Sequence, residues 1–222
     1  MSTPTVLHRD QGIRYQIADE RWAPQVTARI GDSFASEPMT ASLGATAADF
    51  GALAARFIPE CLSNQLSVVA VSLKKSERVA GALINRDFKS PMPAGVPSDF
   101  SWFVPMVEAL TIIDSAYEAK KPTRDKGETI DFWMLAVDAE RFGRRGIGGT
   151  LLRLSTEVAR QRGFRRGVAE CTGHYSQSAA RKAGFAEMAS VAYSDFTYQG
   201  KKVFAGIPAP HTHLMFFEKG LA

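Results

Sequence analysis

Apolar residues recur along this chain with two periods, and the two periods separate helices from strands. Positions 22–34 carry a large apolar residue at every fourth place, which predicts a helix with one buried stripe. Pro38 should prevent this helix from continuing through Glu37, because the residue before a proline is pushed toward extended geometry. Similar reasoning predicts further helices at 47–61, 103–119, 147–162 and 176–183.

Strands are expected where apolar residues alternate or run without interruption. The segments 66–73 and 78–85 flank a short polar turn at 74–77, which is typical of a hairpin. The run TIDFWMLAV at 129–137 is almost continuously apolar, as in a strand buried on both faces. Further strands are predicted at 13–17, 167–171, 191–198 and 213–217.

The order of these elements predicts one α/β domain over residues 13–222. Residues 1–12 carry no clear pattern and are expected to form a flexible N-terminus. The proline-rich stretch 87–99 is expected to be a long loop. Strand 129–137, a glycine loop, a helix and strand 167–171 make a βαβ-like unit, which places a ligand site at the carboxyl end of the first strand.

The composition of the 222 residues excludes several classes of protein. Hydrophobic residues make up 45% and charged residues 23%, which fits a chain with a packed core rather than a disordered one. No apolar run approaches the ~20 residues of a membrane span, and the N-terminus lacks the pattern of a signal peptide. Cys61 and Cys171 are too few for a disulfide framework or a cysteine-rich zinc site. We therefore expect a cytoplasmic protein with reduced thiols, no metal and no membrane partner.

Positive charge is concentrated in one segment, although the formal net charge is only +4. Eight arginines lie between Arg141 and Arg166, and Glu157 is the only acidic residue among them. Such a cluster suits a phosphorylated ligand or nucleic acid. A solvated helix face with arginines for solubility explains the same pattern, and the position of the charges does not separate these readings.

A glycine loop between Arg144 and Gly149 enters the helix directly after the apolar strand. The N-terminus of a helix presents unpaired N–H groups, and glycines let a phosphate approach the backbone closely. The two arginines add charge-assisted contacts. The loop has neither the Gly-Lys-Ser/Thr ending of a Walker A loop nor the GxGxxG spacing of a dinucleotide site. A diphosphate-bearing ligand is the expected occupant, and a plain connecting turn is the alternative.

The segment LAVDAERFGRRGIGGTLL resembles the acetyl-CoA-binding motif of the GNAT superfamily of N-acetyltransferases. The resemblance implies a mixed, mostly antiparallel twisted sheet flanked by helices, and acetyl-CoA as cosubstrate. Gly143 stands where the family has Gln or Arg, so that contact is expected to come from Arg141 or Arg144. The implied backbone contacts to the pantetheine arm are Leu135, Ala136 and Val137, and those to the pyrophosphate are Arg144, Arg145, Gly146, Ile147, Gly148, Gly149 and Thr150.

Three short segments narrow the resemblance to insect-type arylalkylamine and dopamine N-acetyltransferases. Ser36-Glu37-Pro38-Met39 is similar to their D-E-P-L segment. The stretch CTGHYS at 171–176, with RKAGF at 181–185, and Pro210-His211-Thr212 are similar to two later motifs. The resemblance implies transfer of an acetyl group to a small primary amine by direct attack in a ternary complex.

Glu37 is the candidate general base, acting through water, because acetylation requires the ammonium of the substrate to lose a proton. Many members of the superfamily use a tyrosine as acid, but Ala180 holds that position here. Ser176, and less directly Tyr175, are the candidate acids, although a serine at this place also caps helices. We expect Glu37, Thr172, His174 and His211 to contact the amine substrate.

Several alternatives remain at this point. Cys171 and His174 suggest a thiolate–imidazole pair, but no orienting residue is evident and an inert thiol is the simpler reading. The acceptor can instead be an aminoglycoside, an amino acid or a protein lysine. A non-catalytic CoA-binding module and a nucleic-acid-binding module are rivals from other classes, with nucleic acid the less expected partner. An apolar pocket would favour an arylalkylamine, and an open cleft rich in acidic residues would favour a polyamine or an aminoglycoside. The protein is expected to be a monomer or a homodimer.

Overall fold

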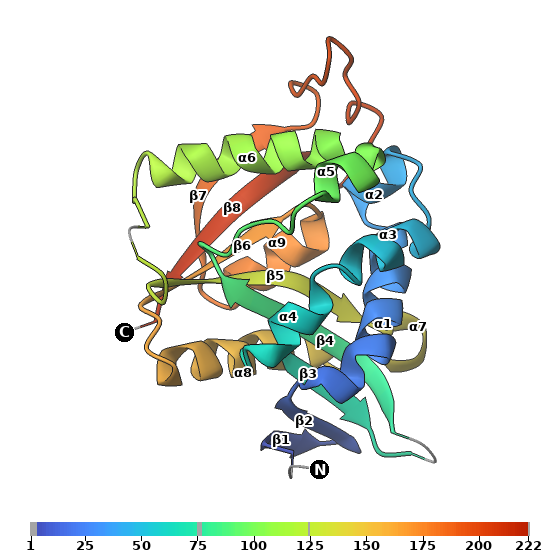
Figure 1. Ribbon diagram of the computed structural model, residues 1–222, viewed down its shortest axis with the longest axis vertical. Coiled ribbons are helices and arrows are strands. Elements are labelled where there is room, and N and C mark those ends of the chain that lie inside the picture. Colours follow the sequence, from blue (N-terminus) through green and yellow to red (C-terminus); the bar gives the residue numbers. More distant parts are fainter. Residues whose placement is uncertain (1–3, 75–76, 124, 222) are drawn as a thin grey trace.

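An eight-stranded sheet organises the residues described by the computed structural model, which are 4–74, 77–123 and 125–221 (Figure 1). The strand order is β1-β2-β3-β4-β5-β6-β8-β7. All neighbouring strands are antiparallel except β5 and β6. The strands are β1 (Val6–Asp10), β2 (Ile13–Ile17), β3 (Val68–Ser72), β4 (Arg78–Asp87), β5 (Thr129–Val137), β6 (Arg166–Cys171), β7 (Ala186–Ala192) and β8 (His213–Gly220).

Strands β5 and β6 separate soon after they start. They pair only from Thr129 to Asp131 on β5, opposite Arg166 to Val168 on β6. At Gly167 an added Cβ would lie 2.4 Å from Cε2 of Phe132, so the ring of Phe132 occupies the place of a side chain there. From Phe132 onward β5 pairs only with β4 in the described residues, and this separation opens the centre of the sheet.

Helices cover both faces of the sheet and define two cores. One core packs α1, α3, α4 and α6 against the sheet, and the other packs α8 and α9 against the opposite face. In Figure 1, α6 crosses β7 and β8, whereas α4 lies over the middle strands and α3 packs against α1. The helices are α1 (Ala23–Ala35), α2 (Pro38–Ser42), α3 (Ala47–Ala54), α4 (Ile58–Ser63), α5 (Val96–Asp99), α6 (Val104–Glu118), α7 (Ala139–Phe142), α8 (Ile147–Gln161) and α9 (His174–Lys182).

The main expectations for the fold are confirmed. The mixed, mostly antiparallel sheet, the hairpin of β3 and β4 and the β5–α8–β6 unit are all present. Positions 75 and 76 of the expected hairpin turn lie outside the described residues, as do positions 1–3. Within the described residues, no helix combines the length and the apolar character that crossing a bilayer requires.

Four local predictions were wrong. The supposedly unstructured N-terminus contains β1, whose largely exposed side chains give no apolar pattern because its backbone pairs at the sheet edge. The helix predicted at 47–61 is broken into α3 and α4, with Pro59 in the first turn of the second. The strand predicted at 191–198 lies instead at Ala186–Ala192, because the chain turns at Asp195. The proline-rich loop ends in the short helix α5.

Candidate active site

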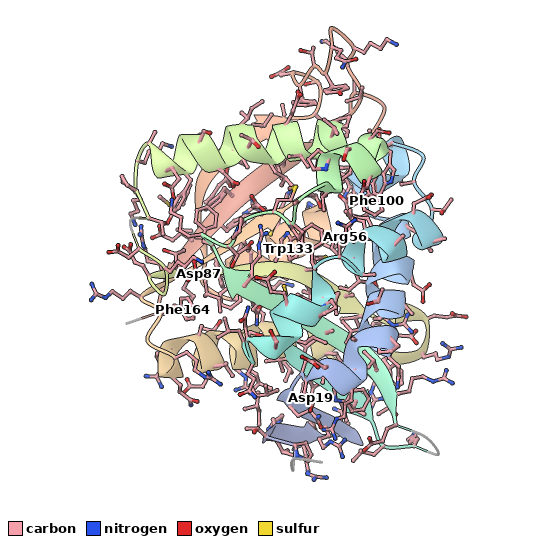
Figure 2. All side chains as sticks on the ribbon, viewed as in Figure 1. Asp19, Arg56, Asp87, Phe100, Trp133 and Phe164 are labelled. Carbon is pink, nitrogen blue, oxygen red and sulfur yellow. The ribbon has the colours of Figure 1, made fainter. Side chains whose placement is uncertain are left out.

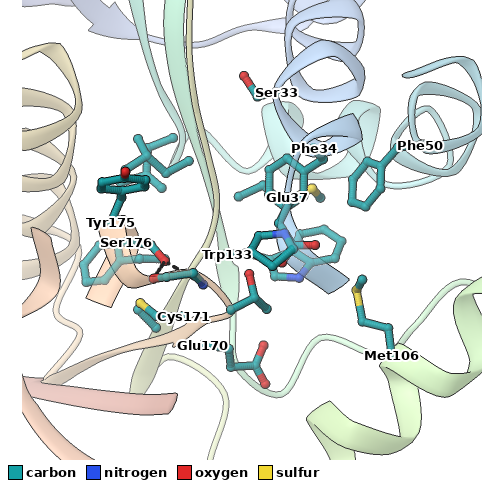
Figure 3. Close-up of a pocket in the computed structure, with 18 of the residues that line it drawn as sticks. Ser33, Phe34, Glu37, Phe50, Met106, Trp133, Glu170, Cys171, Tyr175 and Ser176 are labelled. Atoms are coloured by element: carbon teal, nitrogen blue, oxygen red, sulfur yellow. Dashed lines mark hydrogen bonds between the residues drawn. The ribbon is translucent and has the colours of Figure 1, made fainter. Parts of the chain in front are cut away.

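A cavity of about 390 Å³ lies where β5 and β6 separate, and residues from both cores line it (Figure 3). Trp133, near the centre of the molecule in Figure 2, belongs to this wall. Because apolar residues from opposite faces of the sheet meet here, the cavity passes through the gap in the sheet. The apolar lining includes Phe34, Phe50, Phe57, Phe103, Met106, Phe132, Trp133, Leu135, Leu152 and Ala180.

Glu37 immediately precedes α2 as its N-cap residue, and it lines the cavity. Its Oε1 accepts a hydrogen bond from the Met39 N–H at 3.0 Å. Its Oε2 accepts from the Thr40 N–H and from the Thr40 hydroxyl, both at 2.8 Å. Proline at the next position starts the helix and holds Glu37 extended, with φ −67° and ψ 137°. The carboxylate is therefore fixed in place as a helix cap, a role that sequence reasoning did not assign to it.

Ser176 is in the first turn of α9 and lines the same cavity. Its hydroxyl donates to the Gly173 carbonyl at 2.8 Å and accepts from the Gly173 N–H at 3.3 Å, as the dashed lines in Figure 3 show. The serine thus performs the capping role that was the alternative to an acid. Ala180, one turn further along α9, lines the cavity at the place of the tyrosine found in many GNAT proteins, so no phenol approaches from that position.

Thr172, Tyr175 and His211 also line the cavity. The His174 N–H donates to Nδ1 of His211 at 3.1 Å. An Nδ1 that accepts a hydrogen bond carries no proton, so the neutral His211 ring has its proton on Nε2. The exposed Tyr175 ring packs edge-on against His211, with ring centroids 5.7 Å apart. The His174 side chain is exposed and does not line the cavity, so it lies outside the expected cluster of Glu37, Thr172 and His211.

Tyr193 is a buried residue near the site that sequence reasoning missed. Its hydroxyl donates to the Thr172 carbonyl at the end of β6. Burial, followed by the charge of Glu37, raises the pKa of Tyr193 above its usual range. Sequence reasoning placed Tyr193 inside a strand, and only the turn after β7 brings it beneath Thr172.

Cys171 is a free, buried thiol in the cavity wall. Burial raises the pKa of its thiol to about 12, against a smaller opposing effect of the Ser176 hydroxyl. Because the thiolate is the nucleophilic form of cysteine, this burial supports the simpler reading of Cys171 over a thiolate–imidazole pair. The described residues contain no disulfide, since Cys61 and Cys171 are both free and buried.

The N-terminus of α8 is open and lies against β5. Gly146 precedes the helix with φ +70°, and no side chain caps the helix at this end. The first main-chain hydrogen bond of the helix joins the Thr150 N–H to the Gly146 carbonyl at 3.0 Å. A Cβ at Gly149 would meet nothing within 4 Å, and one at Gly148 would lie 3.7 Å from Leu135. The glycines that were expected to contact the pyrophosphate therefore leave free space and N–H donors for an anion.

The side chains around this loop differ from expectation. Arg145 donates to the Gln11 carbonyl in the turn between β1 and β2, whereas Arg144 is exposed and holds a left-handed backbone with φ +61°. The Thr150 N–H is already engaged by the Gly146 carbonyl. Glycine is required at Gly143, because an added Cβ would lie 2.4 Å from the Ala139 carbonyl oxygen. The absence of the family's Gln or Arg there has a local steric cause.

Asp138 ties the end of β5 to its surroundings. Its carboxylate pairs with Arg29 of α1 at 3.0 Å and with Arg141 at 3.2 Å, and it caps α7 through the Arg141 N–H. Burial raises the pKa of Asp138, but the hydrogen bonds from Arg141 and the charge of Arg29 outweigh it and hold the pKa below its usual value. Arg141 thus has a partner in Asp138, and its expected contact with the ligand in place of the missing Gln or Arg stays a prediction.

No protein-family model matches this sequence. Solved structures do match it over nearly its whole length. The arylalkylamine N-acetyltransferase 2 of Aedes aegypti shares 21% identity, with 96% of this chain and 100% of that chain covered and a TM-score of 0.80. A polyamine N-acetyltransferase of Drosophila melanogaster that forms N-acetylagmatine shares 18% identity, covers 94% and 99%, and has a TM-score of 0.71.

The condensation domain of Ebony, solved with beta-alanyl-dopamine, is also similar, with 13% identity, coverage of 94% and 98%, and a TM-score of 0.82. One backbone architecture therefore carries several acyl-acceptor chemistries, and identities this low establish the architecture rather than the substrate. The sheet with its separated β5 and β6, the helices on both faces and these neighbours show that the chain has the fold of the GNAT N-acetyltransferases.

Proposed function

We propose that this protein transfers an acetyl group from acetyl-CoA to a small primary amine. The observation that carries the proposal is the continuity between two sites. Leu135 lines the cavity that holds Glu37, and it also lies 3.7 Å from the Cβ position of Gly148 in the open N-terminus of α8. A CoA whose diphosphate is held at the loop can extend along β5 and bring its thioester to an amine held in the cavity. The solved neighbours that act on arylalkylamines and polyamines support an amine as acceptor.

The donor side of the site is built from backbone. The N–H groups at Ile147, Gly148 and Gly149, with the positive end of the α8 dipole, suit the diphosphate of CoA. Bound acetyl-CoA would supply an activated acetyl group as a thioester. The edge of β5 from Leu135 to Val137 faces the gap left by β6 and offers N–H and C=O groups to an extended ligand.

On the acceptor side, Glu37 is the base in this proposal. Three hydrogen bonds hold its carboxylate still, and the carboxylate remains in contact with the cavity. A carboxylate in this position can accept the proton of an ammonium through one water. The Ser176 hydroxyl, already donating to the Gly173 carbonyl, would release that bond to give its proton to the leaving thiolate, and it would take a proton back from the newly acylated nitrogen. Tyr175 is the second hydroxyl available from the same helix.

Gly149→Asp tests the donor site directly. The side chain has room, since a Cβ there meets nothing within 4 Å, and an Asp in the first turn favours the helix. The added negative charge faces the diphosphate, so the affinity for acetyl-CoA measured by calorimetry should fall by about tenfold or more. Gly149→Asn is the matched control with nearly the same size and no charge.

An affinity equal to that of the wild type in Gly149→Asp would remove the loop from the donor site. Release of free thiol over a panel of amines then distinguishes an enzyme from a protein that binds CoA without turnover. Stabilisation by acetyl-CoA without thiol release for any amine would contradict catalysis and leave only binding.

A further inference from the structure

The cavity has a deep end that a two-carbon acyl group leaves unused. Among the described residues, the last paired positions of β5 and β6 are Asp131 and Val168. The next residue on each strand, Phe132 on β5 and Ala169 on β6, lines the cavity. The cavity therefore reaches down to the point where the two strands meet, and these two residues form its floor.

The level at which donor and acceptor meet lies higher up on both strands. Continuing the register of β5 and β6 places Leu135 level with Thr172, and both residues line the cavity. Leu135 lies against the N-terminus of α8, where the donor is held in the proposed function. Thr172 is followed by Gly173, whose Cβ position lies 3.7 Å from Cδ of Pro38, the residue after Glu37. The thioester and the amine therefore meet near this level.

The distance from this level to the floor is longer than an acetyl group. Three residues separate Thr172 from Ala169, which is roughly 10 Å of extended chain. A carbon–carbon contact with the floor takes about 4 Å of this length, so roughly 6 Å remain for an acyl chain beyond its carbonyl carbon. That length holds about four carbon–carbon bonds of about 1.5 Å each, whereas an acetyl group has one.

The side chains around this deep end are apolar. We call it the acyl lobe, and define it as the part of the cavity lined by Phe132, Leu152, Ala169 and Ala180. None of these four side chains carries a polar group, so the lobe suits a hydrocarbon chain. Two of the four are alanines, which leave the space open. The tyrosine that many GNAT proteins carry at the position of Ala180 would bring a ring and a hydroxyl group to the same wall.

The acyl lobe lies on the face of the sheet that holds the donor. All four of its residues belong to the core that packs α8 and α9 against the sheet, and the N-terminus of α8 is the proposed donor site. Phe50 and Met106 line the cavity from the core on the opposite face. Figure 3 shows Ser176 of α9 on one side of Trp133, and Phe50 and Met106 on the other. A chain in the lobe therefore continues from the thioester, while the substituent of the amine lies on the other side.

We propose that the acyl lobe binds the acyl chain of the donor, so that the protein prefers straight acyl groups of about four to six carbons over acetyl. This inference rests on the proposed transfer from CoA to an amine and extends its donor. The reaction itself is unchanged. The amine nitrogen bonds to the acyl carbon, the carbon–sulfur bond breaks with its electron pair on sulfur, and the sulfur takes the proton of Ser176. Glu37 accepts the proton of the ammonium, and Ser176 recovers a proton from the acylated nitrogen.

A series of donors that differ only in chain length tests the inference. Release of free CoA from acetyl-, butanoyl-, hexanoyl- and decanoyl-CoA is measured with tyramine as the fixed acceptor. Burial of each methylene favours binding by about fourfold, so kcat/KM for butanoyl-CoA should exceed that for acetyl-CoA by about tenfold. Decanoyl-CoA is longer than the lobe and should be poorer than hexanoyl-CoA. A kcat/KM for butanoyl-CoA equal to or below that for acetyl-CoA would overturn the inference.

Two variants should shift the preferred length in opposite directions. Ala180→Leu fills the lobe and should lower the ratio of kcat/KM for hexanoyl-CoA to that for acetyl-CoA by about tenfold. Leu152→Ala enlarges the lobe and should raise the ratio of decanoyl-CoA to acetyl-CoA by about threefold or more. A general loosening of the fold cannot produce both changes. Ala48→Leu, the same substitution at an exposed position of α3, is the matched control and should alter neither ratio.

The outcomes also separate this inference from the proposed function. Turnover of acetyl-CoA in preference to every longer donor would contradict the acyl lobe and leave acetyl transfer standing. Turnover of hexanoyl-CoA without turnover of acetyl-CoA would support the lobe and contradict acetyl as the donor group. A change in the preference among amines in Ala180→Leu, with the preference among donors unaltered, would assign the lobe to the acceptor and overturn the inference.

Binding gives a measurement that does not depend on turnover. The thioethers S-ethyl-CoA and S-butyl-CoA carry alkyl chains of two lengths and cannot transfer them. Calorimetry with the wild type should show tighter binding of S-butyl-CoA by about tenfold, and equal or weaker binding would overturn the inference. This comparison decides the matter if no donor is turned over with any amine. If Ala180→Leu does not fold, the wild-type series and Leu152→Ala decide.

Discussion

The loop before α8 and the cavity beside it are built in opposite ways. The loop and the first turn of α8 form a run of seven consecutive residues, 144–150, which offers main-chain N–H groups and empty space. The cavity is assembled from side chains of α1, α2, α3, α6, β5, β6, α8 and α9 and from the segment before β8. A site built from main-chain groups keeps its binding properties after many side-chain substitutions that leave its space free. A site built from side chains can change its specificity with a single substitution. This arrangement allows the acetyl donor to stay the same while the amine acceptor varies.

The sharpest test of this contrast is Glu37→Gln. The amide keeps an acceptor for the α2 N–H groups but takes up no proton, so kcat/KM for the amine should fall by about 100-fold or more. The affinity for acetyl-CoA in calorimetry should be unchanged, because Glu37 is not part of the loop. A fall in thermal stability alone, with turnover intact, would restrict Glu37 to its role as helix cap.

Arg29→Met tests the ion pair that joins α1 to Asp138 at the end of β5. The change leaves Asp138 with Arg141 as its remaining cation and should lower the free energy of unfolding by about 1–2 kcal/mol at pH 7. The lowered pKa of Asp138 means that its stabilisation is present above the unfolded pKa of about 4 and is lost as the pH falls through the folded value. The difference between wild type and variant should thus shrink toward pH 2 in denaturant titrations. A constant difference would contradict the ion pair.

Tyr193→Phe is expected to have a smaller effect. The change removes one hydrogen bond to the Thr172 carbonyl, which should lower the free energy of unfolding by about 1 kcal/mol. Since Thr172 lines the cavity, KM for the amine should rise while KM for acetyl-CoA stays constant. Tyr198→Phe, in the loop after β7, is the control. Equal changes in both KM values would indicate a general loosening rather than a local one.

The smallest effect is expected at Cys171. With its pKa raised to about 12 by burial, the thiol should not react with iodoacetamide at pH 8 in the folded protein, and Cys171→Ala should retain turnover within about twofold. Denaturation should make both Cys61 and Cys171 reactive, which serves as the internal control. Rapid labelling of Cys171 in the folded state, coupled to loss of activity, would restore the nucleophilic reading.

Features that depend on neighbouring residues in the sequence were predicted better than contacts between residues far apart in the chain. The loop at Arg144–Gly149 and the β5–α8–β6 unit depend on neighbouring residues, so glycine spacing and apolar period were sufficient to predict them. The lining of the cavity joins elements far apart in the chain, and a single acidic residue within an apolar strand, such as Glu170, gives no signal that it will face a cavity. The hydrogen bonds that make Glu37 a helix cap were likewise visible only in three dimensions, whereas capping by Ser176 was an alternative that the sequence already offered.

The divergence of β5 from β6 has one more consequence. A strand that loses its neighbour exposes a ladder of unpaired amides, and on the outside of a protein such an edge invites other chains to add to it. Here the vacant edge lies inside the molecule, flanked by helices on both faces and by β4 and β8 on either side. In the proposed function, the extended arm of CoA joins this edge as an additional strand would. The unpaired N–H and C=O groups of β5 are thus available to a ligand, while their position between helices keeps them from pairing with strands of other chains.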